Sequence, residues 1–246
     1  LLALNSVTSE TVDASKVDTL SGAYSDISAV LTDEQAGEVN LGAGVDLSVS
    51  AATSSPTITE INTLVTSLRT TSGMNGKITA TLDGTVSDAQ AKTLTTDKTK
   101  NDAITVKLSD AVISDAANLS VAADKTTVAI DAGLATGIAG GASDIASALT
   151  AAGTTIDWGF AVDATFTVGV TGANQVDDLN TIMANTTGVI TATVSTQAMA
   201  DALGATGLAK LSLGTVPAEN AKLTITVADA TVNAADLTTL AGKTSV

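Results

Sequence analysis

Three aspartates are the residues of this sequence whose type and position come closest to a ligand site. Asp177 and Asp178 are adjacent, and Asp229 lies beside the turn before the last predicted helix. Calcium binds several carboxylate and carbonyl oxygens, but neither an EF-hand loop nor a Gly-Gly-x-Gly-x-Asp nonapeptide accompanies these residues. We favour the interpretation that these carboxylates cap helix N-termini and solvate the surface. We therefore predict no metal site and no cofactor, with calcium kept as the alternative.

Catalytic chemistry has little support. The sequence contains no His and no Cys, the side chains that most often perform acid–base and nucleophilic steps near neutral pH. It has neither a Gly-x-Ser-x-Gly elbow nor a Ser-x-x-Lys with companion motifs. The glycine-rich stretch 133–141 lacks the Gly-Lys-Ser/Thr ending of a phosphate loop. We predict that the chain is not an enzyme and has no catalytic or cofactor-binding residues.

Two further features concern carbohydrate. Sequons for N-glycosylation begin at Asn118 and Asn185, but such matches arise often by chance in a Thr-rich chain. Trp158 and Phe160 form the only aromatic cluster and could stack on a sugar. Such a pair more often fills a gap in the core, and we favour that role.

The charge of the chain excludes several kinds of partner. Asp and Glu number 26 against 11 Lys and Arg, which gives a formal net charge of −15. This charge repels the phosphates of nucleic acids and of anionic membranes. Residues 134–153 are apolar enough to test as a membrane span, but they are glycine-rich and contain Asp144. We therefore predict no nucleic-acid partner and no membrane span.

Internal repetition is the strongest signal in the sequence. Gly-Lys-Ile-Thr-Ala-Thr-Leu at 76–82 returns as Gly-Val-Ile-Thr-Ala-Thr-Val at 188–194. A second motif consists of an apolar residue, then Asp, Asn or Thr, then Thr, then another apolar residue. It occurs at 17–20, 61–64, 179–182 and 237–240, with a degenerate copy at 91–94. Three of the four steps between successive copies lie close to multiples of about 29 residues. The chain is therefore built from related units.

The two motifs predict different elements. Apolar and polar residues alternate at 104–108, 166–170 and 223–227, as in half-buried strands. Helical spacing is found in two sets of apolar residues: Ile61, Leu64, Val65 and Leu68, and Val176, Leu179, Ile182 and Met183. Predicted helix starts are the Ser-Asp pairs at 87–88, 114–115 and 143–144, and predicted Gly-containing ends lie at 71–73, 187–188 and 241–242.

The composition indicates how these elements pack. Aromatic residues make up only 2% of the chain, although large side chains normally dominate the burial free energy of a core. Each unit can bury only a thin layer, so stability must come from stacking units on one another. We predict an α/β repeat array with solenoid-like stacking of short strands and short helices. The alternative is a string of tandem small α+β modules.

The repeats predict five segments. A second helix type, at 145–149 and 199–203, makes 143–194 and 195–246 consecutive copies of one repeat unit. The other segments are a partial repeat at 1–24, a unit with an insertion at 25–84, and a divergent unit at 85–142. No Pro/Gly/Ser-rich linker separates them. Because the final residues look like the middle of a repeat, we expect a piece of a longer protein.

These repeats resemble those of a known class of proteins. The Ile-Thr-Ala-Thr-Val motif at 190–194, with helices containing Asp-Leu-Asn-Thr-Ile or Asp-Leu-Thr-Thr-Leu, is similar to repeats of very large, acidic, Cys-free bacterial cell-surface proteins. These occur especially in cyanobacteria and include S-layer and adhesin-type proteins. The resemblance implies a secreted, extracellular scaffold at the cell surface, and it transfers no catalytic or ligand residues.

We therefore expect a structural segment of a surface layer, fibre or filament, with copies of itself or neighbouring repeats as partners. One alternative is an adhesin module that binds a polysaccharide or another cell; the scarcity of aromatics argues against it. Another is a viral tail or appendage fibre, although long heptads and Gly-rich β-prism repeats are missing.

Overall fold

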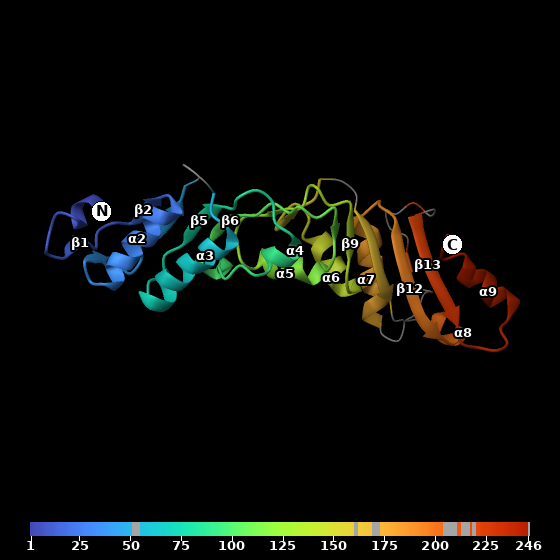
Figure 1. Ribbon diagram of the computed structural model, residues 1–246. Coiled ribbons are helices and arrows are strands. Elements are labelled where there is room, and N and C mark those ends of the chain that lie inside the picture. The colour runs from blue at the N-terminus through green and yellow to red at the C-terminus, as the bar shows by residue number, and fades with distance from the viewer. Residues whose placement is uncertain are drawn as a thin grey trace. The chain divides into compact units, whose positions relative to one another are not determined.

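The computed structural model is mixed α/β with several parallel sheets (Figure 1), which confirms the predicted α/β class. It describes residues 1–50, 55–159, 162–168, 173–203, 211–212, 217 and 220–245. The chain divides into two compact units: unit 1 is Leu1–Leu108 with Val121–Asp131, and unit 2 is Ser109–Ser120 with Ala132–Val246. The five predicted repeat segments stay a prediction.

Unit 1 alternates short strands with short helices. Strands β2, β4, β5 and β6 form a parallel sheet in that order, and β1 pairs in parallel with β3. The elements of unit 1 are α1 (Leu2–Asn5), β1 (Val12–Ala14), β2 (Thr19–Gly22), α2 (Tyr24–Gln35), β3 (Val39–Leu41), β4 (Asp46–Val49), α3 (Ile58–Val65), the π-helix η1 (Thr66–Thr71), β5 (Ile78–Thr81), α4 (Asp88–Ala91), the 3₁₀-helix η2 (Lys98–Lys100), β6 (Ala103–Thr105) and β8 (Ile130–Asp131).

Unit 2 contains the longest strands. Its parallel sheet has the order β13-β12-β11-β9-β7, and in Figure 1 the arrows of β12 and β13 point the same way. Helices α6 and α7 pack against each other, and both contact β11. The elements are β7 (Val112–Ile113), α5 (Ala116–Ala123, whose last three residues belong to unit 1), β9 (Gly137–Ala139), α6 (Ala142–Thr150), β10 (Ile156–Asp157), β11 (Asp163–Val168), α7 (Ala173–Asn185), β12 (Ile190–Gln197), α8 (Met199–Ala202), β13 (Ala221–Val227) and α9 (Ala234–Ala241).

In both units the chain returns to the same sheet after a similar number of residues. A parallel pair needs a crossover between its strands, and here short helices and turns supply it. Paired positions in the sheets are 24 to 31 residues apart: Thr19 and Asp46, Leu47 and Ile78, Thr79 and Ala103 in unit 1, and Gly137 and Asp163, Ala164 and Ile190, Ile190 and Ala221 in unit 2. The period of about 29 suggested by the sequence lies within this range.

The core follows the predicted alternation. In β5, Ile78 and Ala80 are buried while Thr79 and Thr81 are exposed, and β12 repeats this pattern from Ile190 to Val194. The helix positions predicted from apolar spacing are all buried: Ile61, Leu64, Val65 and Leu68, and Val176, Leu179, Ile182 and Met183. Strands β5 and β12 therefore each contribute one apolar face and one Thr-rich face.

Some predicted elements differ from the structure. The motif copy at 17–20 lies in a turn and in β2, not in a helix, and α4 ends at Ala91 before the rest of the copy at 91–94. Helix α6 begins one residue before Ser143, with Gly141 as N-cap and Asp144 in its first turn. At 17–20, pairing of β2 with β4 outweighs the local sequence pattern. Residues 169–170 of the predicted strand at 166–170 lie outside the described residues.

No helix in the described part of the chain is both long and apolar enough to cross a membrane. The apolar stretch 134–153 contains the nine-residue helix α6 instead.

Candidate functional site at the junctions between neighbouring strands

The predicted metal candidates lie in different places. Asp229 Oδ2 accepts a hydrogen bond of 2.5 Å from the N–H of Met199, the first residue of α8. The last helix, α9, is capped by Asn233 and not by Asp229. Asp177 and Asp178 do not cap α7, which begins at Ala173; they lie in its second turn. Across the described ranges, no group of three or more His, Cys, Asp or Glu is placed to hold a metal ion.

Asp178 lies in a groove between α6 and α7. The groove has a volume of about 410 Å³ and is lined by Ala146, Ser147, Thr150, Ala151, Asp178 and Thr181. Burial raises the pKa of the Asp178 carboxyl, and the nearby Asp177 and Asp144 carboxylates raise it further. Ionisation of Asp178 is therefore less favourable in the folded chain than in the unfolded chain.

The residues considered for glycosylation or sugar binding also lie in different environments. Asn118 is only 6% exposed, so its side chain is inaccessible for glycosylation in the folded protein. Asn185 is exposed, and its amide donates to Thr181 O at 2.7 Å. Trp158 is half-buried against α6, where its indole N–H lies 3.4 Å from Ala148 O. Phe160 lies outside the described residues.

The polar groups that recur in the structure lie where the start of one strand meets its parallel neighbour. In the unit 1 junction (Val45, Asp46, Gly76 and Lys77), Asp46 Oδ1 accepts from Lys77 N–H at 2.9 Å. Lys77 Nζ lies 3.6 Å from Asp46 Oδ2. Gly76 packs on the preceding strand so closely that a Cβ there would lie 1.8 Å from Val45 O. Only glycine fits this position.

Unit 2 contains the same arrangement. In the unit 2 junction (Val162, Asp163, Gly188 and Val189), Asp163 Oδ1 accepts from Val189 N–H at 2.6 Å. A Cβ on Gly188 would lie 2.4 Å from Val162 O. The two junctions also share a backbone hydrogen bond of 2.9 Å. It runs from Leu47 N–H to Lys77 O in unit 1 and from Ala164 N–H to Val189 O in unit 2. The Gly that opens the repeated Gly-x-Ile-Thr-Ala-Thr motif is thus the point of closest approach between neighbouring strands.

Threonine hydroxyls extend the ladders beyond the strands. Thr126 Oγ1 accepts from Ile104 N–H and donates to Ile104 O, both at 2.8 Å. Thr244 makes the same pair of bonds with Leu223, at 2.9 and 2.8 Å. Thr186 Oγ1 donates to Val162 O at 2.7 Å and accepts from Gly188 N–H at 3.0 Å. Each threonine follows a helix and bonds to a residue 21 to 24 positions earlier that lies in a strand or directly before one.

Asparagines in the second repeated motif link helices to the following segment. Asn62 Nδ2 donates to Thr93 O at 2.9 Å, and its Oδ1 accepts from Thr95 N–H at 2.8 Å. Asn180, at the matching place in the copy at 179–182, accepts from Ser212 N–H at 2.8 Å. The contacts span 31 to 33 residues, about one repeat.

Unit 1 contains a largely buried ion pair. Arg69, the only arginine in the sequence, lies in η1 and makes a bidentate pair with Asp102 at 2.8 and 2.6 Å. The Asp102 side chain is fully buried and that of Arg69 is 14% exposed. Asp102 also accepts from the backbone N–H of Ile78 and Asp97, at 2.8 and 2.7 Å. All four lone-pair positions of this carboxylate are therefore used.

The sequence motifs contain some of the residues that make these contacts, but they did not predict the contacts themselves. Gly76, Gly188, Asn62 and Asn180 belong to recognised motifs, whereas the Arg69 pair was missed; its one signal is that Arg occurs once. The recurring side chains fix the spacing between strands and satisfy backbone groups. Comparison of the chain with family models, curated proteins and solved structures gives no match.

Proposed function

We propose that this chain is a structural segment of a secreted bacterial cell-surface protein of the S-layer or adhesin type, built as a solenoid of stacked strand–helix repeats. The observation that carries the proposal is the recurrence of one junction in both units. Val45-Asp46 meets Gly76-Lys77 in unit 1 as Val162-Asp163 meets Gly188-Val189 in unit 2.

The recurring contacts suit a load-bearing role. In a repeat array, stability is the sum of each repeat and its interfaces with its neighbours. The junction carboxylates, the threonine hydroxyls and the motif asparagines all connect positions about one repeat apart. Pulling two neighbouring repeats apart must therefore break several hydrogen bonds together. The −15 net charge keeps such a chain soluble outside the cell.

Force spectroscopy on the 246-residue chain, held at both ends, tests this role. A load-bearing array lengthens in steps of whole repeats, each about 80–110 Å for 24 to 31 residues at about 3.5 Å per residue. Gly76→Ala and Gly188→Ala lower the force of the steps that open their junctions. Gly44→Ala does not, because a Cβ there meets nothing within 4 Å. A single low-force extension without steps contradicts the proposal.

The alternative adhesin function makes a different prediction. Exposed Thr191, Thr193, Thr224 and Thr226 lie on neighbouring strands β12 and β13 and offer hydroxyls to a polysaccharide. A glycan array then gives binding that Thr193→Val and Thr224→Val abolish while the force steps persist. Glycan binding without force steps would replace the structural proposal.

A further inference from the structure

The sequence contains one Asn-Gly pair, and the fold places it at the unit 1 junction. Asn75 and Gly76 lie in the loop between η1 and β5, directly before Lys77. In an Asn-Gly pair the next backbone nitrogen attacks the asparagine amide most easily, since glycine has no side chain to hinder the approach. In unit 2 the residue before Gly188 is Thr187, which has no side-chain amide. This chemistry is therefore available at the unit 1 junction and not at the unit 2 junction.

The backbone around this pair is held on both sides. Asn75 N–H donates to Ala43 O at 2.9 Å, and Gly76 O accepts from Arg69 Nη2 at 3.3 Å. Arg69 is itself fixed by the buried Asp102 carboxylate. No described residue accepts a hydrogen bond from the Gly76 N–H. The nitrogen that would attack the amide therefore has no hydrogen bond to break before it reacts.

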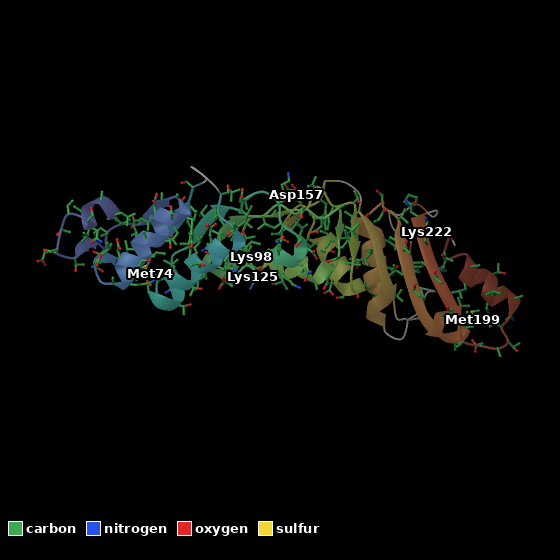
Figure 2. All side chains as sticks on the ribbon, in the orientation of Figure 1. Met74, Lys98, Lys125, Asp157, Met199 and Lys222 are labelled. Carbon is green, nitrogen blue, oxygen red and sulfur yellow. The ribbon has the colours of Figure 1, made fainter. Side chains whose placement is uncertain are left out.

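The side-chain amide of Asn75 is polarised by a lysine. Its Oδ1 accepts from Lys100 Nζ at 3.3 Å, and both residues are exposed. Figure 2 labels Met74 and Lys98, which lie close to these two residues in the sequence of unit 1. No described carboxylate lies within ion-pair distance of Lys100. An ammonium group on this oxygen draws electron density from Cγ and stabilises negative charge that develops on the oxygen.

We propose that Asn75 converts to aspartate and isoaspartate through a cyclic succinimide, and that Lys100 promotes the reaction. Solvent hydroxide removes the Gly76 N–H proton as the nitrogen attacks Asn75 Cγ, and the Lys100 ammonium stabilises the oxyanion that forms at Oδ1. The new N–Cγ bond closes the ring. The Cγ–Nδ2 bond then breaks, and Nδ2 takes a proton from water and leaves as ammonia. Water opens the ring at one of its two carbonyl carbons, so one water is consumed for each ammonia released.

The two products differ in their effect on the junction. Attack of water on Cγ restores the main chain and leaves an aspartate whose carboxylate pairs with the Lys100 ammonium. Attack on the backbone carbonyl carbon of Asn75 routes the main chain through Cβ and Cγ, which inserts one extra carbon directly before Gly76. Gly76 lies so close to Val45 O that a Cβ there would be 1.8 Å away. A lengthened chain cannot keep this contact, so we expect isoaspartate to weaken the junction and aspartate to preserve it.

Peptide mapping of the folded 246-residue chain tests the site. Trypsin cleaves after Arg69 and Lys77, and the peptide 70–77 contains Asn75 as its single asparagine. After incubation at pH 8, mass spectrometry is expected to find this peptide with NH₂ replaced by OH, in two forms that separate by chromatography. A sample digested without incubation gives the baseline. Conversion should rise from pH 6 to pH 8, because hydroxide removes the proton of the attacking nitrogen.

Matched variants test the role of the lysine. Lys100→Gln is expected to slow the conversion about threefold, the rate equivalent of an exposed charge contact. Lys98→Gln is the control, because Lys98 lies in the same short helix η2 and is not the lysine that bonds to Asn75. Asn40, which is exposed and followed by the bulky Leu41, is the internal control and should remain an amide. Circular dichroism confirms that each variant folds.

Urea unfolding tests the effect on the junction. The incubated wild-type chain should unfold at a lower urea concentration than the fresh chain, in proportion to its isoaspartate content. Asn75→Thr, which copies the residue before Gly188 in unit 2, should show no change on incubation. An equal loss in both would contradict the assignment of the damage to this junction.

Three results would overturn the proposal. One is that Asn75 in the folded chain remains an amide under conditions in which the free peptide 70–77 converts. Another is that Lys100→Gln reacts at the wild-type rate. The third is a pair of tryptic peptides joined through Asn75 and Lys100 with loss of ammonia, because the lysine would then be the group that attacks Cγ. None of these measurements depends on whether the chain bears load, so the inference and the proposed function can fail separately.

Discussion

The two units make the same junction with different supporting side chains. In unit 1, strands β2, β4, β5 and β6 have three or four residues each, and the buried Arg69–Asp102 pair supports the sheet. In unit 2, β11, β12 and β13 have six to eight residues, and threonine hydroxyls extend their ladders. A short ladder satisfies few backbone groups, so we expect unit 1 to depend more on its buried ion pair.

The largest expected effect is at the ion pair of unit 1. Arg69→Met leaves the fully buried Asp102 carboxylate without its cation, which is expected to lower the free energy of unfolding by about 3–5 kcal/mol. Urea unfolding followed by circular dichroism measures the loss. Hydrogen exchange should show that protection falls in unit 1 and is retained in unit 2. Equal loss in both units would show that the two are one cooperative structure.

Substituting the glycine at each junction tests whether the two units share the same close strand contact. Gly76→Ala and Gly188→Ala place a Cβ 1.8 and 2.4 Å from the carbonyls of Val45 and Val162. Because backbone must shift in each case, we expect each variant to lose about 1–3 kcal/mol. Thermal unfolding measures this loss, with Gly44→Ala as the neutral control. If either junction tolerates alanine as well as position 44 does, the two junctions are not equivalent.

The threonine contacts are expected to have a smaller effect. Thr126→Val in unit 1 and Thr186→Val in unit 2 each remove a buried hydroxyl that bonds to backbone groups. The unsatisfied groups should cost about 1–2 kcal/mol in either unit, measured by urea unfolding. Thr193→Val, on the exposed face of β12, is the control and should be neutral. A neutral Thr126→Val would mean that water replaces the hydroxyl.

Local sequence patterns predicted the elements better than the contacts between them. The alternation in β5 and β12 and the apolar spacing in α3 and α7 depend on nearby residues, so they could be predicted. The partners of Arg69 and Gly76 are 33 and 31 residues away, and the separation of paired strands varies from 24 to 31. A variable period leaves the register undetermined from sequence alone.

The motif copy at 17–20 shows the limit of local similarity. Its pattern of residue types matches that at 61–64, yet residues 58–65 form α3 while Thr19–Gly22 forms β2. Thr57 and Glu60 make a capping box that starts α3, whereas the copy at 17–20 pairs with β4 instead. The helix start signal and the neighbouring strand, not the four-residue motif, decide the structure.

The smallest expected effects are opposite in sign in the two units. Hydrogen bonds from Thr99 lower the pKa of the Asp97 carboxyl in unit 1, whereas burial, then Asp177 and Asp144, raise the pKa of Asp178 in unit 2. The Asp97 carboxylate therefore stabilises the fold above its unfolded pKa, and this is lost as the pH falls through the lower folded value. The Asp178 carboxylate destabilises the fold at neutral pH, and this penalty disappears as the pH falls through its raised folded pKa.

Asp97→Asn and Asp178→Asn convert this contrast into a measurement. At pH 7 we expect Asp97→Asn to lower, and Asp178→Asn to raise, the free energy of unfolding by about 0.5 kcal/mol or less, because both groups are partly exposed. Urea unfolding of both variants and the wild type from pH 7 to pH 3 should show both differences shrinking toward zero. If Asp178→Asn destabilises the chain at pH 7, the charged carboxylate is stabilised in the fold and the expected penalty is wrong. Repeating the titration with calcium and with chelator then tests whether calcium provides that stabilisation.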